Sequence, residues 1–68
     1  MTLKTRDLGD LIRKVRKSQG VTQKDLALTA GVGLRFISDL ENGKETCEIA
    51  KVLIVLDTLA INVRLEIP

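Results

Sequence analysis

The sequence predicts an all-α core of four to five short helices with one β-strand at the C-terminus, in a single domain over residues 1–68. Three observations predict this fold. Apolar residues recur at helical spacing through most of the chain. Glycines separate the periodic segments. The last residues alternate between polar and apolar side chains, which is the pattern of a half-buried strand. We expect a helical core over residues 5–60 and a strand over residues 61–68.

The first helix is predicted over residues 5–19 and ends at Gly20. Its core-facing stripe consists of Leu8, Leu11, Ile12 and Val15. Basic residues lie mostly off this stripe. Residues 1–24 carry seven Lys or Arg against two Asp, whereas residues 25–68 carry four basic and seven acidic residues. This uneven charge suits a polyanionic partner, although a solvated helix face would explain it as well.

Two short helices follow, separated by a tight turn. The first opens at Thr22, where Asp25 occupies the last position of a capping box, and it ends at Gly31. The second is predicted over residues 34–42 and ends at Asn42 and Gly43, because both residue types tolerate positive φ. Two short helices joined by a glycine-containing turn are the signature of a helix-turn-helix motif.

A fourth helix is predicted over residues 47–59, with Thr46 as its N-cap. Its core stripe consists of Ile49, Val52, Leu53, Leu56 and Leu59. Ile54 and Val55 are apolar too, so this helix must be buried over most of its circumference. Residues 52–55 would also suit a strand, but the length and the period of the segment favour a helix.

The predicted strand has no partner strand elsewhere in the sequence. An unpaired strand leaves backbone donors and acceptors open, and pairing with the same strand of a second copy would satisfy them. A 68-residue domain with 44% hydrophobic residues also favours oligomerisation. We therefore predict a homodimer whose interface contains Ile54, Val55, Val63, Leu65 and Ile67.

Residues 19–44 read QGVTQKDLALTAGVGLRFISDLENGK. This stretch resembles the helix-turn-helix family of phage Cro-type repressors, often called the XRE family, and the resemblance extends over residues 5–60. It implies a lambda-repressor-like fold and sequence-specific binding to double-stranded DNA. The segments RFISDLENGKETC and NVRLEI resemble a narrower subgroup, the HipB-like antitoxins, which pair a C-terminal strand across their dimer.

The exposed side chains of residues 34–39 are predicted to enter the major groove. Arg35 is the strongest candidate for a base contact because a guanidinium matches guanine O6 and N7, with a phosphate contact or solvation as alternatives. Leu34 suits a thymine methyl group, and Ser38 suits several bases. Asp39 is unfavourable near phosphates unless it accepts from a cytosine amino group, so we place it at the periphery.

Phosphate contacts are expected on either side of that helix. A helix N-terminus at Thr22 and Gln23 attracts phosphate, and the resemblance implies that Gln23 contacts the DNA backbone, with plain capping as the alternative. The resemblance also places Asn42 and Lys44 on the backbone. The predicted DNA-binding residues are Thr22, Gln23, Lys24, Gly33, Leu34, Arg35, Ser38, Asp39, Asn42 and Lys44. Gly33 stands where many relatives carry a polar contact residue.

The resemblance further implies an ion pair of structural role between Glu41 and Arg16 of the first helix. Phe36 is predicted to pack against the core. The lone Cys47 cannot form an internal disulfide.

The residue types argue against several function classes. Without histidine no ordinary zinc site can be assembled, and no nucleophile is paired with an obvious base. We therefore predict no enzymatic activity, metal or cofactor. No apolar stretch approaches the ~20 residues of a membrane span, and no apolar segment typical of a secretory signal is visible at the N-terminus. We expect a cytoplasmic protein that does not enter the membrane.

The resemblance implies a transcriptional repressor that binds palindromic DNA as a homodimer. Its narrower form implies the antitoxin of a HipBA-like toxin–antitoxin operon, with a HipA-like kinase toxin as a further partner. A stand-alone helix-turn-helix regulator without a toxin would use the same DNA face and remains the alternative.

Overall fold

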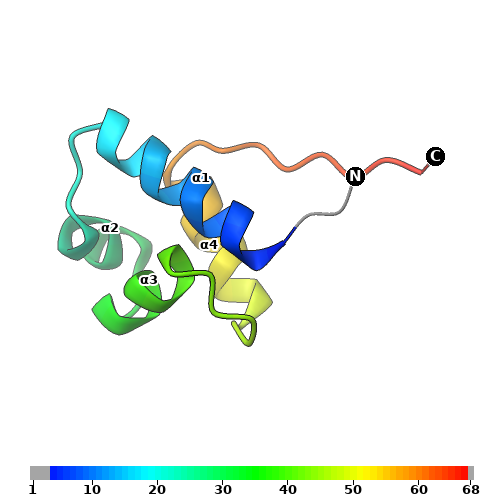
Figure 1. Ribbon diagram of the computed structural model, residues 1–68. Helices are drawn as coiled ribbons and strands as arrows, with labels where there is room; N and C mark the ends of the chain where they lie inside the picture. The colour runs from blue at the N-terminus through cyan, green and yellow to red at the C-terminus, as the bar shows by residue number, and fades with distance from the viewer. Residues whose placement is uncertain (1–3, 68) are drawn as a thin grey trace.

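The computed structural model describes residues 4–67, and four helices make up its regular structure (Figure 1). They are α1 (Thr5–Ser18), α2 (Gln23–Ala30), α3 (Leu34–Glu41) and α4 (Ile49–Thr58). α3 packs against both α1 and α2, and α2 also contacts α4. The predicted all-α core is confirmed. None of the helices among residues 4–67 has the length and apolar content that crossing a membrane requires.

The ends of α2 follow from its sequence. The hydroxyl of Thr22 accepts from the backbone N–H of Asp25 at 3.0 Å, and the carboxylate of Asp25 accepts from the N–H of Thr22 at 3.4 Å. This is the predicted capping box, and it fixes the first turn. Gly31 ends the helix at φ +72°, a conformation that costs glycine little.

α4 begins two residues later than predicted. Its first residue is Ile49 and its N-cap is Glu48, so Thr46 is not the cap. The thiol of Cys47 lies 3.4 Å from the carbonyl oxygen of Lys44, which it satisfies as a donor. The chain passes from α3 to α4 through a turn at residues 42–43 and an irregular stretch over residues 44–48, and the helix starts only after it.

The core lies between the four helices. Its buried apolar side chains are Ile12, Leu26, Ala27, Ile37, Leu40, Val52, Val55, Leu56 and Leu59. The prediction that Val55 belongs to a dimer interface is wrong, because this side chain is completely buried within its own chain. The neighbouring Ile54 is about half exposed.

Three residues assigned to core stripes are exposed instead. Leu11, Ile49 and Leu53 each keep about half or more of their surface in solvent. They border a groove between α1, α4 and the chain after α4. No element among residues 4–67 of the single chain covers this groove, so side chains at core spacing remain exposed there.

The C-terminal segment leaves the helices as an extended tail (Figure 1). The N–H of Ile61 donates to the carbonyl of Leu56 at 2.8 Å, and the Ile61 side chain packs against the core. Residues 61–67 have no regular secondary structure in the single chain. Strand pairing across a dimer requires a second chain, so it stays a prediction. Pro68 lies outside the described residues.

Gly9 of α1 lies directly against the end of α3. A Cβ atom here would lie 2.5 Å from the carbonyl oxygen of Leu40 and 2.7 Å from that of Glu41. We expect Gly9→Ala to lower the free energy of unfolding by about 1–3 kcal/mol in urea denaturation, because backbone atoms cannot move aside as a flexible side chain does. Gly33→Ala is the control, since no atom lies within 4 Å of a Cβ there. A Gly9→Ala variant as stable as the parent would contradict the close approach of α1 and α3.

Candidate nucleic-acid interface

The exposed face of α3 and the start of α2 form one shallow concave surface. It is lined by Gln23, Leu34, Arg35, Ser38 and Asp39, all of which were predicted to bind DNA. The side chain of Arg35 is 92% exposed, so its guanidinium is free to reach a base edge. Leu34 also borders a neighbouring hollow that contains Lys24. The structure thus brings the residues of the motif's two helices onto a single face.

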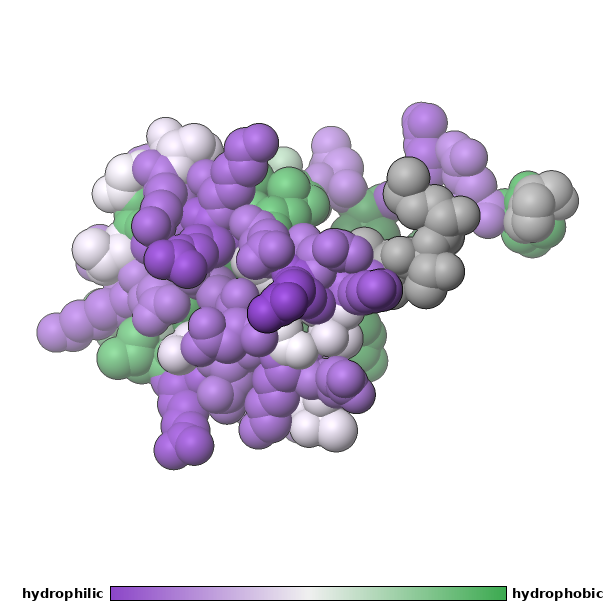
Figure 2. All heavy atoms as spheres, in the orientation of Figure 1, coloured by the Kyte–Doolittle hydropathy of each residue, from purple (hydrophilic) through white to green (hydrophobic). Residues whose placement is uncertain are grey.

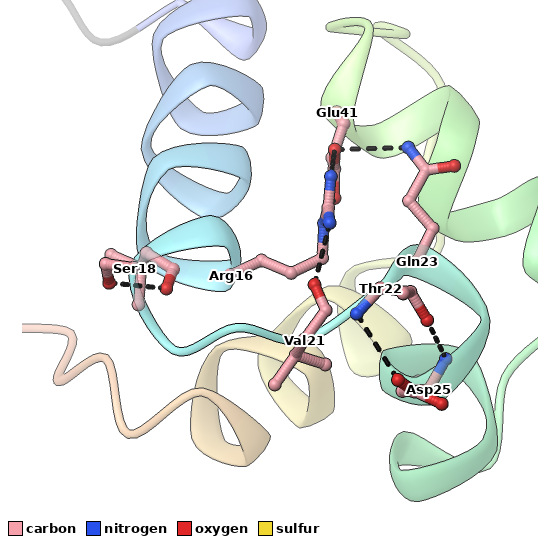
Figure 3. A network of polar contacts seen from close by, with 8 residues as sticks. Arg16, Ser18, Val21, Thr22, Gln23, Asp25 and Glu41 are labelled. Atoms are coloured by element: carbon pink, nitrogen blue, oxygen red, sulfur yellow. Dashed lines mark hydrogen bonds and ion pairs between the residues drawn. The ribbon is translucent and has the colours of Figure 1, made fainter.

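Gln23 is tied into a polar network below this face (Figure 3). Its Nε2 donates to Glu41 Oε1 at 3.1 Å, and its side chain is partly buried. This contact joins the first turn of α2 to the last turn of α3. It fixes the position of the helix whose N-terminus is expected to meet a phosphate.

Arg16 and Glu41 form the centre of this network. Arg16 Nε lies 2.6 Å from Glu41 Oε2, and Arg16 Nη2 lies 3.0 Å from Glu41 Oε1, so the pair is bidentate. A third donor, Arg16 Nη1, reaches the carbonyl oxygen of Val21 at 2.8 Å. The two side chains are only 9% and 2% exposed. The network therefore connects α1, α3 and the loop before α2, and it sets the angle at which α3 is presented (Figure 3).

The pair also shifts the protonation equilibria of both partners. The hydrogen bond to Glu41 raises the pKa of Arg16 despite burial. Burial alone would raise the pKa of Glu41, but the hydrogen bonds from Arg16 and Gln23 and the charges of Arg16 and Arg13 together lower it below its usual value. Both residues are therefore charged at neutral pH, which is the condition for a stable buried pair.

The turn after α3 presents Asn42 and Lys44 to solvent. Gly43 between them adopts φ +79°, and a Cβ there would lie 2.9 Å from Cα of Arg6. Thr5 Oγ1 donates to the carbonyl oxygen of Gly43 at 2.8 Å. The start of α1 therefore lies against this turn.

This contact adds two cations that the sequence reasoning did not include. Lys4 and Arg6 line a surface hollow together with Asn42 and Glu45. The cluster of basic residues within 1–24 was the available signal, but it does not tell which of them lie near α3. The face seen in Figure 2 is largely hydrophilic.

Two predicted residues contribute little chemistry of their own. Gly33 is the N-cap of α3 and is exposed, and its φ of −72° does not require glycine. The hydroxyl of Thr22 already accepts the hydrogen bond that caps α2. Both stand immediately before a helix, Thr22 as the N-cap of α2 and Gly33 as the N-cap of α3.

The sequence matches a known family of DNA-binding domains over most of its length. The profile of the helix-turn-helix family matches residues 12–64, which contain the second half of α1 and all of α2, α3 and α4. The chain belongs to the helix-turn-helix family. It is 55% identical over 62 residues to y4mF of Sinorhizobium fredii (strain NBRC 101917 / NGR234), an uncharacterized HTH-type transcriptional regulator. That alignment covers 91% of this chain and 82% of the relative.

Two solved structures share the fold of this helix-turn-helix regulator. An MDT protein and a HipA-HipB-O2-O3 complex each match with a TM-score of 0.86 and 25% sequence identity, over 96% of this chain and 92% of theirs. These matches confirm the predicted fold class. Together with the family match they confirm the resemblance to XRE-type, HipB-like proteins.

A second, apolar surface of this helix-turn-helix protein lies outside the concave face. A groove of about 350 Å³ runs between α1, α4 and the tail. Its apolar lining consists of Leu8, Leu11, Ile49, Val52, Leu53, Leu56, Ile61 and Val63. Leu65 and Ile67 continue the apolar side of the tail and are almost fully exposed.

Proposed function

We propose that this helix-turn-helix regulator represses transcription by binding palindromic double-stranded DNA as a homodimer, with α3 in the major groove. The observation that carries the proposal is the placement of Arg35. Its exposed guanidinium stands on the free face of α3, in the helix that the family uses for recognition, and it offers the donor pair that guanine O6 and N7 accept.

Cations around α3 support phosphate contacts on either side of the groove. Lys44 and Asn42 follow the helix, and Lys4 and Arg6 extend the same edge. Lys24 stands at the opposite edge, in the first turn of α2. Cations on both edges of a recognition helix fix its register on the duplex without reading sequence.

A homodimer explains the apolar groove and the tail. The groove is lined mainly by apolar side chains, and Ile54, Val63, Leu65 and Ile67 are each about half or more exposed. Clustered exposed apolar side chains are typical of an interaction surface. Pairing of two tails about a two-fold axis would satisfy their backbone groups, and their apolar sides would cover the grooves. Such a dimer carries two copies of α3, which suits a palindrome.

We further propose that the protein is the antitoxin of a HipBA-like operon and binds a HipA-like kinase. The match to a HipA-HipB-O2-O3 complex over nearly the whole chain supports this. A stand-alone regulator is the second candidate, since the relative from Sinorhizobium fredii is named as a transcriptional regulator alone. A kinase-like reading frame beside the gene, whose purified product binds the dimer, would favour the antitoxin. The absence of a kinase-like reading frame beside the gene would favour the stand-alone regulator.

Selection from a random duplex library tests the DNA proposal. The 68-residue chain should enrich a palindrome with half-sites about one helical turn, roughly 34–36 Å, apart. Its affinity should fall with a log–log salt slope of about −0.9 per phosphate contacted. Failure to enrich any sequence, or affinity that is independent of salt, would refute the proposal.

A further inference from the structure

A single carboxylate oxygen on the DNA face lies between two cations. Asp39 Oδ2 is 3.9 Å from Arg35 Nε and 3.5 Å from Lys44 Nζ. We propose, building on the proposed DNA-binding function, that Asp39 determines specificity in two ways. It orients Arg35 toward guanine, and it repels phosphate at sites that lack this guanine.

The orienting part follows from which atom of Arg35 faces the acid. Asp39 approaches Nε, so the Nη1 and Nη2 end of the guanidinium remains available. Two donors at that end match O6 and N7 of guanine. An arginine loses much side-chain freedom when it binds, and a partner that already restricts the chain reduces that loss. The Asp39 side chain is 30% exposed and that of Arg35 92% exposed, so Asp39 is the more enclosed of the two partners.

Helix stability does not explain this pair. Arg35 stands in the first turn of α3, where the helix dipole favours an anion, and Asp39 stands in the last turn, where it favours a cation. An exposed i, i + 4 pair is also weak in water. Each charge thus lies at the helix end where the dipole destabilises it. The pair therefore does not stabilise α3, and we assign it a role in the contacts that α3 makes with DNA.

The repelling part follows from the charge of the surrounding residues. Asp39 is the one acid among the ten residues predicted to contact DNA. Attraction to phosphate supplies most of the affinity for unrelated sequences. A carboxylate on this face lowers the affinity for every duplex. Only at a site where Arg35 contacts its guanine does that contact offset the lost affinity. Repulsion from wrong sites raises specificity even where it lowers affinity.

Asp39→Asn tests the proposal, because it removes the charge and nearly keeps the shape. Affinity should be measured on the duplex selected by the parent, on that duplex with the guanine of each half-site replaced by adenine, and on an alternating A·T duplex. We expect Asp39→Asn to bind the alternating duplex about three- to tenfold more tightly. The preference for guanine over adenine should fall about fivefold or more. Asp57→Asn is the control, since it makes the same charge change on α4.

The outcomes separate the two proposals. An unchanged guanine preference in Asp39→Asn, with a parent that discriminates, would overturn the role of Asp39 and leave the DNA function intact. Tighter binding of equal size in Asp57→Asn would also overturn it, because net charge alone would then explain the gain. A parent that binds all three duplexes alike would overturn both. Equal melting temperatures of parent and Asp39→Asn are expected, since the pair does not hold the fold.

Discussion

Glu41→Leu should lower the free energy of unfolding by about 3–5 kcal/mol, because it strands a buried guanidinium. The hydrogen bonds of the Arg16 side chain to described residues go to Glu41 and Val21, and this side chain is only 9% exposed. Arg16→Met should cost a similar amount by stranding the carboxylate. Urea denaturation at pH 7 measures both, since both groups are charged there in the folded protein.

The double variant distinguishes a true pair from two independent losses. Arg16→Met combined with Glu41→Leu should recover much of the stability, because an apolar pair of similar volume leaves no buried charge. Recovery should be incomplete, since the carbonyl of Val21 and the amide of Gln23 each lose a partner. Strictly additive effects would show that the ion pair does not stabilise the fold.

Truncation after Asn62 should abolish the dimer and with it tight binding to palindromic DNA. The cut keeps Ile61 on the core and every predicted base contact, but it removes Val63, Leu65 and Ile67. Two half-sites can then no longer be bound by one linked pair of helices, so the gain in affinity from linkage is lost. Sedimentation of the truncated chain should give a monomer. On dilution, the melting temperature should fall for the 68-residue chain but not for the truncated chain.

Substitutions within the tail separate the interface from chain length. Leu65→Asp should mimic the truncation, because it places a charge in the proposed apolar layer. Glu66→Ala is the matched control, since Glu66 alternates with Leu65, does not line the groove and is paired with Arg64 in the described structure. A truncated chain that remains a dimer with unchanged melting behaviour would place the interface elsewhere.

Local rules of sequence account for most of the fold. Apolar spacing located α1, and the capping box at Thr22 located α2 to the residue. The start of α4 was misplaced because Thr46 is a good cap by type, whereas the turn after α3 uses Cys47 to satisfy Lys44. Capping preference describes a single residue type, whereas the start of this helix depends on the contact that Cys47 makes with Lys44 across Thr46.

The burial of α4 could not be read from its composition. Val55 and Ile54 are neighbours of similar character, yet one is completely buried and the other about half exposed. An all-round apolar helix gives no periodic signal that tells its core side from its outer side. For the candidate site, the information missing from the sequence was a contact between residues far apart in the chain. Thr5 Oγ1 donates a hydrogen bond to the carbonyl oxygen of Gly43, 38 residues away, and this contact holds Arg6 beside the turn after α3. The spacing of residues along the sequence does not predict a contact over such a distance.

Whether Arg35 reads a base is tested most directly by a loss-of-contact cycle on the selected palindrome. Each base pair of the half-site is replaced in turn, and affinity is measured for the parent, for Arg35→Ala and for Arg13→Ala as an exposed control on α1. The parent should lose about 1–3 kcal/mol at one guanine per half-site. Arg35→Ala should bind the intact site that much more weakly and lose nothing further when this guanine is replaced, whereas Arg13→Ala should keep the parent's preference. An Arg35→Ala variant that still discriminates at every position would contradict the assignment of α3 as the recognition helix.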